Sequence, residues 1–311
     1  MKRICVIASG GDAPGMNACL EAIYLHAGAR GYETWVAFSG YDGLIYDNIS
    51  YVTPEKVIGI SGISGYVYKS ARSPLFTTKQ GFTAAISNIK KHGFEAVIVI
   101  GGNGSFIGAG RLKKAGIPVI GVPATIDNDV FTTRHNLGFS SACETAVQMV
   151  DMLRATMETN QRDHVVLLMG RHCDDLARTV GQATFADIID MEGNRHTPQM
   201  VANIFAAKRK AGKTSCMMIM QERKGPSAIQ EAIDAANYMQ ELCTVSGDSQ
   251  IRMNTLGHLQ RGAPPSCRDR FLAVAYGRGA VDSIVKKHFG VSLAMIDRDV
   301  CLVDLPVAPI P

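Results

Sequence analysis

The chain has 311 residues, of which 46% are apolar and 19% are charged, and its formal net charge is +4. This is ordinary globular composition, and the length suits about two domains. The small net charge, with no clustered basic stripe, argues against a nucleic-acid-binding protein.

Short apolar runs alternate along the chain with longer segments of helical character. The runs at 3–9, 33–39, 96–102, 117–123, 164–170 and 215–221 are continuous and rich in β-branched residues. Strands buried on both faces of a parallel sheet have this pattern. Helices are expected near 17–28, 78–92, 105–115, 140–158, 197–211 and 227–242. The alternation predicts an α/β fold with open parallel sheets, and the best seam between two sets of units lies near 135–139.

Two features of the sequence, its apolar runs and its cysteines, indicate the cellular compartment. The apolar run at 4–8 is shorter than the roughly 7–15 residues of a signal-peptide core, and no stretch approaches the roughly 18 apolar residues of a membrane span. The eight cysteines are dispersed and form no CxxC pair. We therefore expect a cytoplasmic protein with reduced thiols and no membrane partner.

Glycine-rich turns follow two of the predicted strands, each directly before a helix. Residues 9–17 read SGGDAPGMN, and residues 101–105 read GGNGS. Glycine lets the backbone turn sharply and approach a ligand, and the free N–H groups at the start of a helix suit a phosphate. Tight packing alone is the alternative for one such turn. Two turns at the carboxyl ends of strands favour a phosphate site.

Three common nucleotide-binding signatures are absent. No GxGxxG opens a helix after the first strand, and the protein-kinase signature set is missing. The segment 207–214 ends in GKT, but Ala207 replaces the first glycine of a P-loop, and the segment precedes a strand. These observations argue against a dinucleotide-dependent dehydrogenase, a P-loop enzyme and a protein kinase.

An acidic loop, PATIDND at 123–129, follows the strand at 117–123. Two carboxylates, Asp127 and Asp129, are costly to bury without partners. In a phosphate site, one can accept a proton from an attacking hydroxyl while the other helps to bind Mg²⁺. A solvated turn is the alternative. Together with the two glycine turns, the loop predicts catalysis of phosphoryl transfer.

Six motifs resemble those of the bacterial-type phosphofructokinase family and come in the same order. They are GGDAPGMN at 10–17, SAR at 70–72, GGNGS at 101–105, PATIDND at 123–129, MGR at 169–171 and GHLQRG at 257–262. The resemblance covers nearly the whole chain. It implies a cytoplasmic, ATP- and Mg²⁺-dependent kinase that phosphorylates the 1-hydroxyl of fructose 6-phosphate in glycolysis.

The resemblance also implies two Rossmann-like α/β domains with mainly parallel sheets and an active site in the interdomain cleft. We place the nucleotide-binding domain at 1–138 and about 258–303, and the sugar-phosphate-binding domain at 139–257 with the C-terminal tail. It further implies a homotetramer in which some substrate contacts cross a subunit boundary.

Site residues follow from the resemblance position by position. The nucleotide-site positions are Gly11, Arg72, Ser73, Gly102, Asn103, Gly104, Ser105, Gly108 and Arg111. The fructose 6-phosphate positions are Thr125, Asp127, Met169, Gly170, Arg171, Glu222, His258 and Arg261, with Arg162 and Arg252 reaching a neighbour's substrate phosphate. Asp127 is the expected base. Thr125, Arg72, Arg171 and Gly11 complete the catalytic set, and Asn103 and Asp129 are the expected magnesium ligands.

The chain departs from the family pattern at Asn103, where GGDGS is usual. The amide keeps an oxygen ligand but loses a charge, so Asn103→Asp is expected to raise kcat or to lower the magnesium requirement. Gly104 and Ala124 favour ATP over pyrophosphate, because pyrophosphate-using relatives usually carry Asp and Lys there.

The usual allosteric nucleotide site is expected to be degenerate. Glu21 and Leu25 replace arginines, Pro54 stands at an often basic position, and only Arg154 and Lys213 remain of its cations. Little response to ADP or phosphoenolpyruvate is therefore expected through this site.

Alternative functions remain open at this point. The chain could phosphorylate another sugar phosphate, such as sedoheptulose 7-phosphate, or use pyrophosphate. A weakly active regulatory paralogue is an alternative of another class, which Asn103 favours and the retained Asp127, Arg72 and Arg171 oppose.

Overall fold

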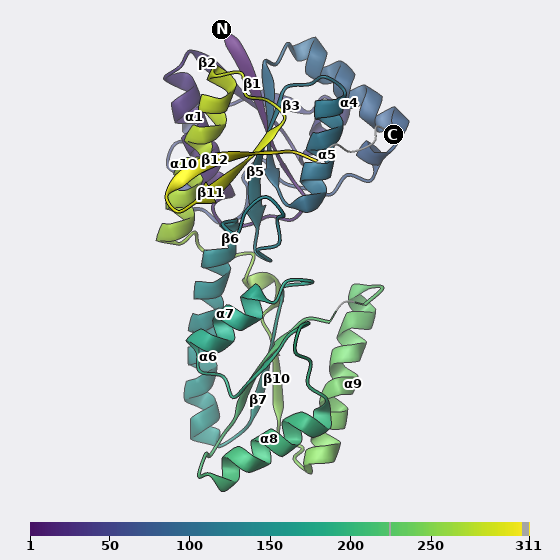
Figure 1. Ribbon diagram of the computed structural model, residues 1–311, viewed down its shortest axis with the longest axis vertical. Helices are drawn as coiled ribbons and strands as arrows, with labels where there is room; N and C mark the ends of the chain where they lie inside the picture. Colours follow the sequence, from purple (N-terminus) through teal and green to yellow (C-terminus); the bar gives the residue numbers. More distant parts are fainter. Residues whose placement is uncertain (224, 307–310) are drawn as a thin grey trace. The chain divides into compact units, whose positions relative to one another are not determined.

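The computed structural model describes residues 1–223, 225–306 and 311, which fall into two compact units (Figure 1). The first unit comprises Met1–Ser141 and Arg261–Pro311, and the second comprises Ala142–Gln260. Both carry mainly parallel sheets flanked by helices, so the fold is of the expected α/β class. No helix in the described ranges is long and apolar enough to cross a membrane.

The sheet of the first unit has the strand order β12-β11-β5-β4-β1-β2-β3, with β6 paired to β5. Its strands are β1 (Lys2–Ser9), β2 (Tyr32–Ala37), β3 (Ile49–Tyr51), β4 (Ala96–Gly101), β5 (Val119–Thr125), β6 (Leu137–Gly138), β11 (Val291–Ile296) and β12 (Asp299–Asp304). Pairs β1–β2, β1–β4, β4–β5 and β5–β11 are parallel, whereas β2–β3 and β11–β12 are antiparallel. The carboxyl ends of β1, β4 and β5 therefore lie side by side.

Helices cover both faces of this sheet. They are α1 (Met16–Gly28), α2 (Tyr41–Ile45), α3 (Pro54–Val57), α4 (Lys79–His92), α5 (Asn103–Lys114) and α10 (Cys267–Val285), with 3₁₀ turns at Ile60–Gly62 and Leu75–Thr77. Figure 1 shows α1 and α10 together on one face, and α4 and α5 on the other. The apolar side chains between α4, α5 and the sheet form one buried cluster, which includes Phe82, Phe106 and Leu112.

The second unit has a smaller parallel sheet of order β10-β7-β9-β8. Its strands are β7 (His164–Leu168), β8 (Ile188–Asp190), β9 (Met217–Gln221) and β10 (Arg252–Thr255). Its helices are α7 (Asp175–Ala183), α8 (Pro198–Lys210) and α9 (Ala228–Ser246), α6 (Phe139–Asn160) leads into it, and a 3₁₀ turn spans Gly257–Leu259. Val165, Met218, Phe205 and Leu242 belong to one buried cluster of this sheet with α8 and α9.

Local sequence signals define several helix ends. The hydroxyls of Thr78, Thr197 and Ser227 each accept a hydrogen bond from a backbone N–H of the first turn of α4, α8 and α9. Gly93 and Gly247 end α4 and α9 in the left-handed region, at φ 64° and 67°.

All six predicted strands and all six predicted helices are present within a few residues of their expected bounds. The strands that sequence analysis missed are short or lie near sheet edges, such as β3 and β10. The strand β12 lies in the first unit, in agreement with the assignment of about 258–303 to the first domain. Beyond it, Leu305 of the tail that we assign to the second domain is only 2% exposed in the apolar cluster of the first unit.

The crossing of α1 and α10 depends on Gly277. A Cβ atom there would lie 2.7 Å from the Ala22 Cβ and 3.1 Å from the Cys19 carbonyl oxygen. Gly277→Ala is expected to lower the free energy of unfolding by about 1–3 kcal/mol, because α10 must move away from α1.

Gly28, at the end of α1, has no neighbour within 4 Å of a built Cβ. Gly28→Ala is the matched control and should stabilise by about 0.4–1 kcal/mol. Urea unfolding followed by circular dichroism measures both variants. Equal stability of the two variants would contradict this packing.

Candidate active site

The first glycine turn links β1 to α1. Gly10 has φ 89° and donates its N–H to the Ala71 carbonyl at 3.0 Å. This bond places the segment that carries Arg72, an exposed side chain, beside the turn. Gly15, at φ 90°, directly precedes α1. Both glycines adopt backbone angles that other residues reach only with strain.

Gly11 is covered by a guanidinium group. A Cβ atom at Gly11 would lie 2.6 Å from Nη1 of Arg261, and the same nitrogen donates to the Asp12 carbonyl at 3.0 Å. We expected Arg261 at the sugar-phosphate position. In the structure it belongs to the first unit and lies against the first glycine turn.

The second glycine turn joins β4 to α5 and is tied to the first. Ser105 is 5% exposed, and its hydroxyl donates to the Ser9 carbonyl at 2.8 Å. A Cβ at Gly101 would lie 2.4 Å from the Ser105 Oγ, so the close approach requires glycine. Gly104 is exposed, and no atom lies within 4 Å of a Cβ built there. The turn therefore presents open backbone at the start of α5.

Asp127 lies just beyond β5, at the same edge of the sheet. Its side chain is buried, with only 6% of the residue exposed. Its backbone N–H donates to the Thr125 hydroxyl at 3.1 Å. The next residue, Asn128, has φ 58° and accepts a hydrogen bond from the Asn136 amide at 2.8 Å. Both contacts hold the turn that carries the carboxylate.

The side chain of Asn103 joins the second glycine turn to the acidic loop. Its Nδ2 donates to the Asp129 carbonyl at 2.8 Å and lies 3.4 Å from the Asp129 Oδ2. Its Oδ1 accepts from the Phe131 N–H at 3.2 Å. An aspartate at 103 could accept the last bond but could not donate the first two. Where the family pattern has a charged aspartate, Asn103 is therefore neutral and donates hydrogen bonds that join the second glycine turn to the acidic loop.

Gly108 is in contact with an aromatic ring. A Cβ at Gly108 would lie 2.6 Å from the Tyr41 ring, which stacks on Phe76 with a centroid distance of 4.0 Å. The Tyr41 hydroxyl donates to the Ser105 carbonyl at 2.7 Å, and burial raises its pKa. Sequence reasoning did not select Tyr41, because an aromatic residue outside the named motifs gives no signal of its own.

Ser73 and Arg111 complete the expected nucleotide positions. The Ser73 hydroxyl accepts from the Phe76 N–H at 3.2 Å and supports the turn after Arg72. Arg111 lies in the last turn of α5, and its positive charge acts on Tyr41.

The second unit gathers another expected group of residues at the carboxyl ends of β7 and β9. Gly170 and Arg171 follow β7 with φ 136° and 46°, and the Arg171 N–H donates to the Glu222 Oε1 at 3.1 Å. Met169 is buried, and its N–H donates to the Oε1 of Gln260 at 2.9 Å. Gln260 stands inside the motif GHLQRG, but sequence reasoning did not select it.

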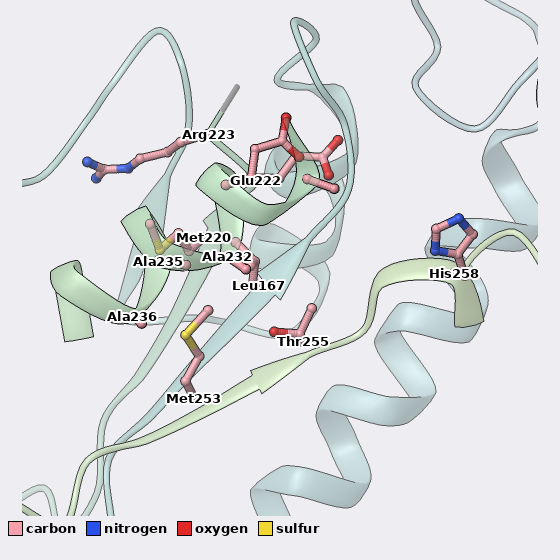
Figure 2. Close-up of a pocket in the computed structure, with 12 residues that line it drawn as sticks. Leu167, Met220, Glu222, Arg223, Ala232, Ala235, Ala236, Met253, Thr255 and His258 are labelled. Atoms are coloured by element: carbon pink, nitrogen blue, oxygen red, sulfur yellow. The ribbon is translucent and has the colours of Figure 1, made fainter. Parts of the chain in front are cut away.

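Glu222 and His258 line a cavity of about 440 Å³ (Figure 2). The cavity lies between α9 and the strands β7, β9 and β10. Its other lining residues are mainly apolar: Leu167, Met220, Ala228, Ala232, Ala235, Ala236 and Met253, with Arg223, Glu231 and Thr255. Figure 2 shows the Arg223 side chain extending away from His258, and its guanidinium lies 4.6 Å from the centre of the Tyr238 ring.

Arg162 and Arg252 lie at the other end of this sheet. Arg252 opens β10 and pairs with His164, the first residue of β7. Burial, and then the charges of Arg252 and Arg162, lower the pKa of His164. The Arg162 Nε donates to the Gln250 Oε1 at 3.1 Å. Within one chain, the two arginines are therefore not in the group formed by Glu222 and Arg171.

Comparison with known proteins matches this arrangement to one family. Residues 3–284 fit the phosphofructokinase family model. The chain is 37% identical to the ATP-dependent 6-phosphofructokinase of Streptococcus suis over 307 residues, which covers 99% of this chain and 88% of that protein. It is also 37% identical to the enzyme of that name from Lactobacillus delbrueckii over 295 residues, covering 95% and 90%.

A solved structure agrees with this match. Phosphofructokinase from Pichia pastoris superposes with a TM-score of 0.87 at 28% identity and covers 98% of this chain, which spans 35% of that longer chain. The glycine turns, the acidic loop and the MGR and GHLQRG segments thus occur in the fold that this family uses. The chain belongs to the phosphofructokinase family.

Proposed function

We propose that the protein is an ATP-dependent 6-phosphofructokinase that transfers the γ-phosphoryl group of ATP to the 1-hydroxyl of fructose 6-phosphate. The observation that carries the proposal is the buried Asp127, which lies beside two glycine turns that are tied to each other and to its own loop. The names of the bacterial relatives support ATP and fructose 6-phosphate as substrates.

In this proposal the first unit binds the nucleotide. Backbone N–H groups of the turns at Gly11 and at Gly102–Gly104 face the phosphates, and the positive end of α5 adds to their attraction. Two of the expected nucleotide contacts, Ser105 and Gly108, are better suited to shaping the site than to touching the nucleotide. The Ser105 hydroxyl is engaged with Ser9, and Gly108 provides space for Tyr41, so each shapes the site from behind.

Asp127 is proposed as the general base. Its carboxylate takes the proton of the 1-hydroxyl as that oxygen attacks the γ-phosphorus, the bond to the β–γ bridging oxygen breaks, and ADP leaves. Thr125 holds the backbone of this turn. Arg72, Arg171 and the Gly11 N–H are proposed to stabilise the charge that spreads over the transferred group.

The second unit is proposed to bind the sugar phosphate. The Glu222 carboxylate accepts hydrogen bonds from sugar hydroxyls, and Met169 and Gly170 shape the adjoining wall. His258 pairs with the 6-phosphate, for which charged, directional donors are well suited. Arg261, which belongs to the first unit and lies against Gly11, is proposed as a further donor to this phosphate. Arg162 and Arg252 are proposed to reach the substrate of a neighbouring subunit in a homotetramer. Their distance from Glu222 along the strands of one chain supports that assignment.

The residues present fit a magnesium ion through one carboxylate and one amide oxygen. Mg²⁺ is commonly held by one or two carboxylates together with substrate phosphates and water. Asp129 is exposed and supplies the carboxylate, and the Oδ1 of Asn103, which accepts from the Phe131 N–H, keeps a second lone pair for a cation. We propose that these two residues hold the ion, which when bound neutralises charge on the phosphates.

The open space at the second glycine turn supports ATP rather than pyrophosphate as the phosphoryl donor. No atom lies within 4 Å of a Cβ built at Gly104, so there is room for an inner phosphate of a nucleotide. Ala124 is 2% exposed and adds only a methyl group. Coupled assays with each donor decide, and faster turnover with pyrophosphate would overturn the choice of ATP.

Asp127→Ser is expected to lower kcat with ATP, Mg²⁺ and fructose 6-phosphate by about 10²–10⁴-fold, because the attacking hydroxyl loses its base. A coupled assay for ADP release measures it. Thr125→Val is the companion variant: it removes the hydroxyl that holds the turn and should give a smaller loss. Retention of full kcat by Asp127→Ser would refute the assigned base.

Asn103→Asp is expected to lower the thermal midpoint in the absence of Mg²⁺, because the donors to Asp129 are lost and two carboxylates face each other. Added Mg²⁺ should recover it by binding between them. Asn103→Ala is the control, since it loses both donors to Asp129, and the bond from the Phe131 N–H, without adding charge. Equal stabilisation of both variants by MgCl₂ would contradict the site. Initial rates at varied MgCl₂ should show a higher kcat or a lower magnesium requirement in Asn103→Asp, and no change in either would refute the role of the missing charge.

The usual effector site is proposed to be non-functional. The Glu21 carboxylate accepts hydrogen bonds from the N–H groups of Gly59 at 2.8 Å and Ser61 at 2.9 Å. An internal carboxylate therefore engages backbone donors that could otherwise bind an anion, and it repels a second one.

The two remaining cations also have partners within the chain. The Lys213 Nζ lies 2.5 and 2.6 Å from the carboxylate oxygens of Asp187, and Arg154 donates to the Thr184 carbonyl. A diphosphate would have to displace both contacts.

Adding ADP or phosphoenolpyruvate at saturating ATP should therefore leave the fructose 6-phosphate saturation curve unchanged. Initial rates over a range of fructose 6-phosphate concentrations measure this, and saturating ATP removes competition by ADP at the donor site. A clear shift of the half-saturation point with either compound would contradict it.

A further inference from the structure

Gln221 is a fully buried polar residue that ends β9 and that no motif marked. In the sheet, β9 lies between β7 and β8, so the loops that follow these two strands flank the Gln221 side chain. A buried amide is retained at little cost only when its donors and acceptor are paired.

The side chain bonds to both flanking loops. Its Nε2 donates to the Arg171 carbonyl at 3.0 Å and to the Cys173 carbonyl at 3.1 Å. Its Oε1 accepts from the Glu192 N–H at 2.7 Å, in the loop after β8. Two donors and one acceptor match the amide group of glutamine, whereas a glutamate of the same shape would lack both donors.

The loop that Gln221 holds carries Arg171 in a strained backbone conformation. Arg171 has φ 46°, which residues other than glycine rarely adopt, and such a conformation persists only where neighbours enforce it. The Arg171 N–H is bonded to the Glu222 carboxylate and its carbonyl to Gln221. Gln221 and Glu222, which are consecutive residues at the end of β9, thus bind the carbonyl and the N–H of Arg171.

A second side chain holds the end of β9 itself. Arg195 donates through Nη1 to the Gln221 carbonyl at 3.1 Å and through Nη2 to the Glu222 carbonyl at 3.5 Å. The same Nη1 lies 3.0 Å from the carboxylate of Asp190, which is fully buried at the end of β8. Gln221 is therefore fixed at its backbone as well as at its side chain.

We propose that Gln221 is a positioning residue. It holds the loop after β7 to the loop after β8 and so orients Arg171 and Glu222 for sugar-phosphate binding. The proposal rests on the proposed function, which assigns Glu222 to the sugar hydroxyls and Arg171 to the charge on the transferred group. Gln221 itself does not touch the substrate. It acts through the backbone of Arg171.

Two variants test the proposal. Gln221→Glu keeps the acceptor for Glu192 but loses both donors, and Gln221→Met is uncharged and loses all three bonds. Each is expected to raise the KM for fructose 6-phosphate by about tenfold or more through Glu222 and to lower kcat through Arg171, while leaving the KM for ATP within about twofold.

The control is Phe205→Leu, in α8. Phe205 is 1% exposed in the apolar cluster of the second unit, so its replacement should lower the thermal midpoint without changing either KM. Equal changes of both KM values in the two Gln221 variants, or a lower kcat alone, would overturn the positioning role.

Hydrogen exchange provides a readout that does not need turnover. The Arg171 and Cys173 amides should exchange at least about tenfold faster in both Gln221 variants, and at the wild-type rate in Phe205→Leu. Unchanged exchange at these amides would overturn the inference even if KM rises. A wild-type protein that fails to phosphorylate fructose 6-phosphate would refute the proposed function, while the exchange data would still test how Gln221 holds the loop.

Discussion

The hydrogen bond from the Ser105 hydroxyl to the Ser9 carbonyl joins two glycine turns that are about 96 residues apart in the sequence. It is possible because β1 and β4 are adjacent parallel strands whose carboxyl ends reach the same edge. Asn103 extends the connection to the loop after β5. Three loops that are far apart in the sequence thereby form one surface, and the Thr125 hydroxyl holds the backbone of Asp127 in it.

The second sheet uses the same principle with different chemistry. There the loops after β7 and β8 are joined across β9 by the amide of Gln221, and Arg171 is held in a conformation it would not adopt alone. Parallel strands bring the loops together in both units, and one buried polar side chain then sets their relative positions. When such a side chain is truncated, the backbone groups of the loops that it bonded are left unpaired. Its loss therefore affects the loops more than the core.

Much of the fold and of the site could be predicted from the sequence. The continuous apolar runs identified the central strands, and the glycine and acidic motifs directly follow three of them. Contacts between distant segments could not be predicted. Nothing local to Arg261 places it against Gly11, and nothing near Gly108 indicates that Tyr41 fills the space beside it. The short polar strand β10 also lacks a hydrophobic pattern, and Leu305 belongs to no periodic apolar run, so its burial in the first unit could not be predicted.

We propose that the turns at 9–16 and 101–105 and the loop at 125–129 act as one phosphate-binding surface. Hydrogen exchange with and without a non-hydrolysable ATP analogue and Mg²⁺ tests this proposal. The backbone amides of all three segments are expected to become protected together, over the same range of ligand concentration. Protection of one segment without the other two, or protection confined to the second unit, would contradict it.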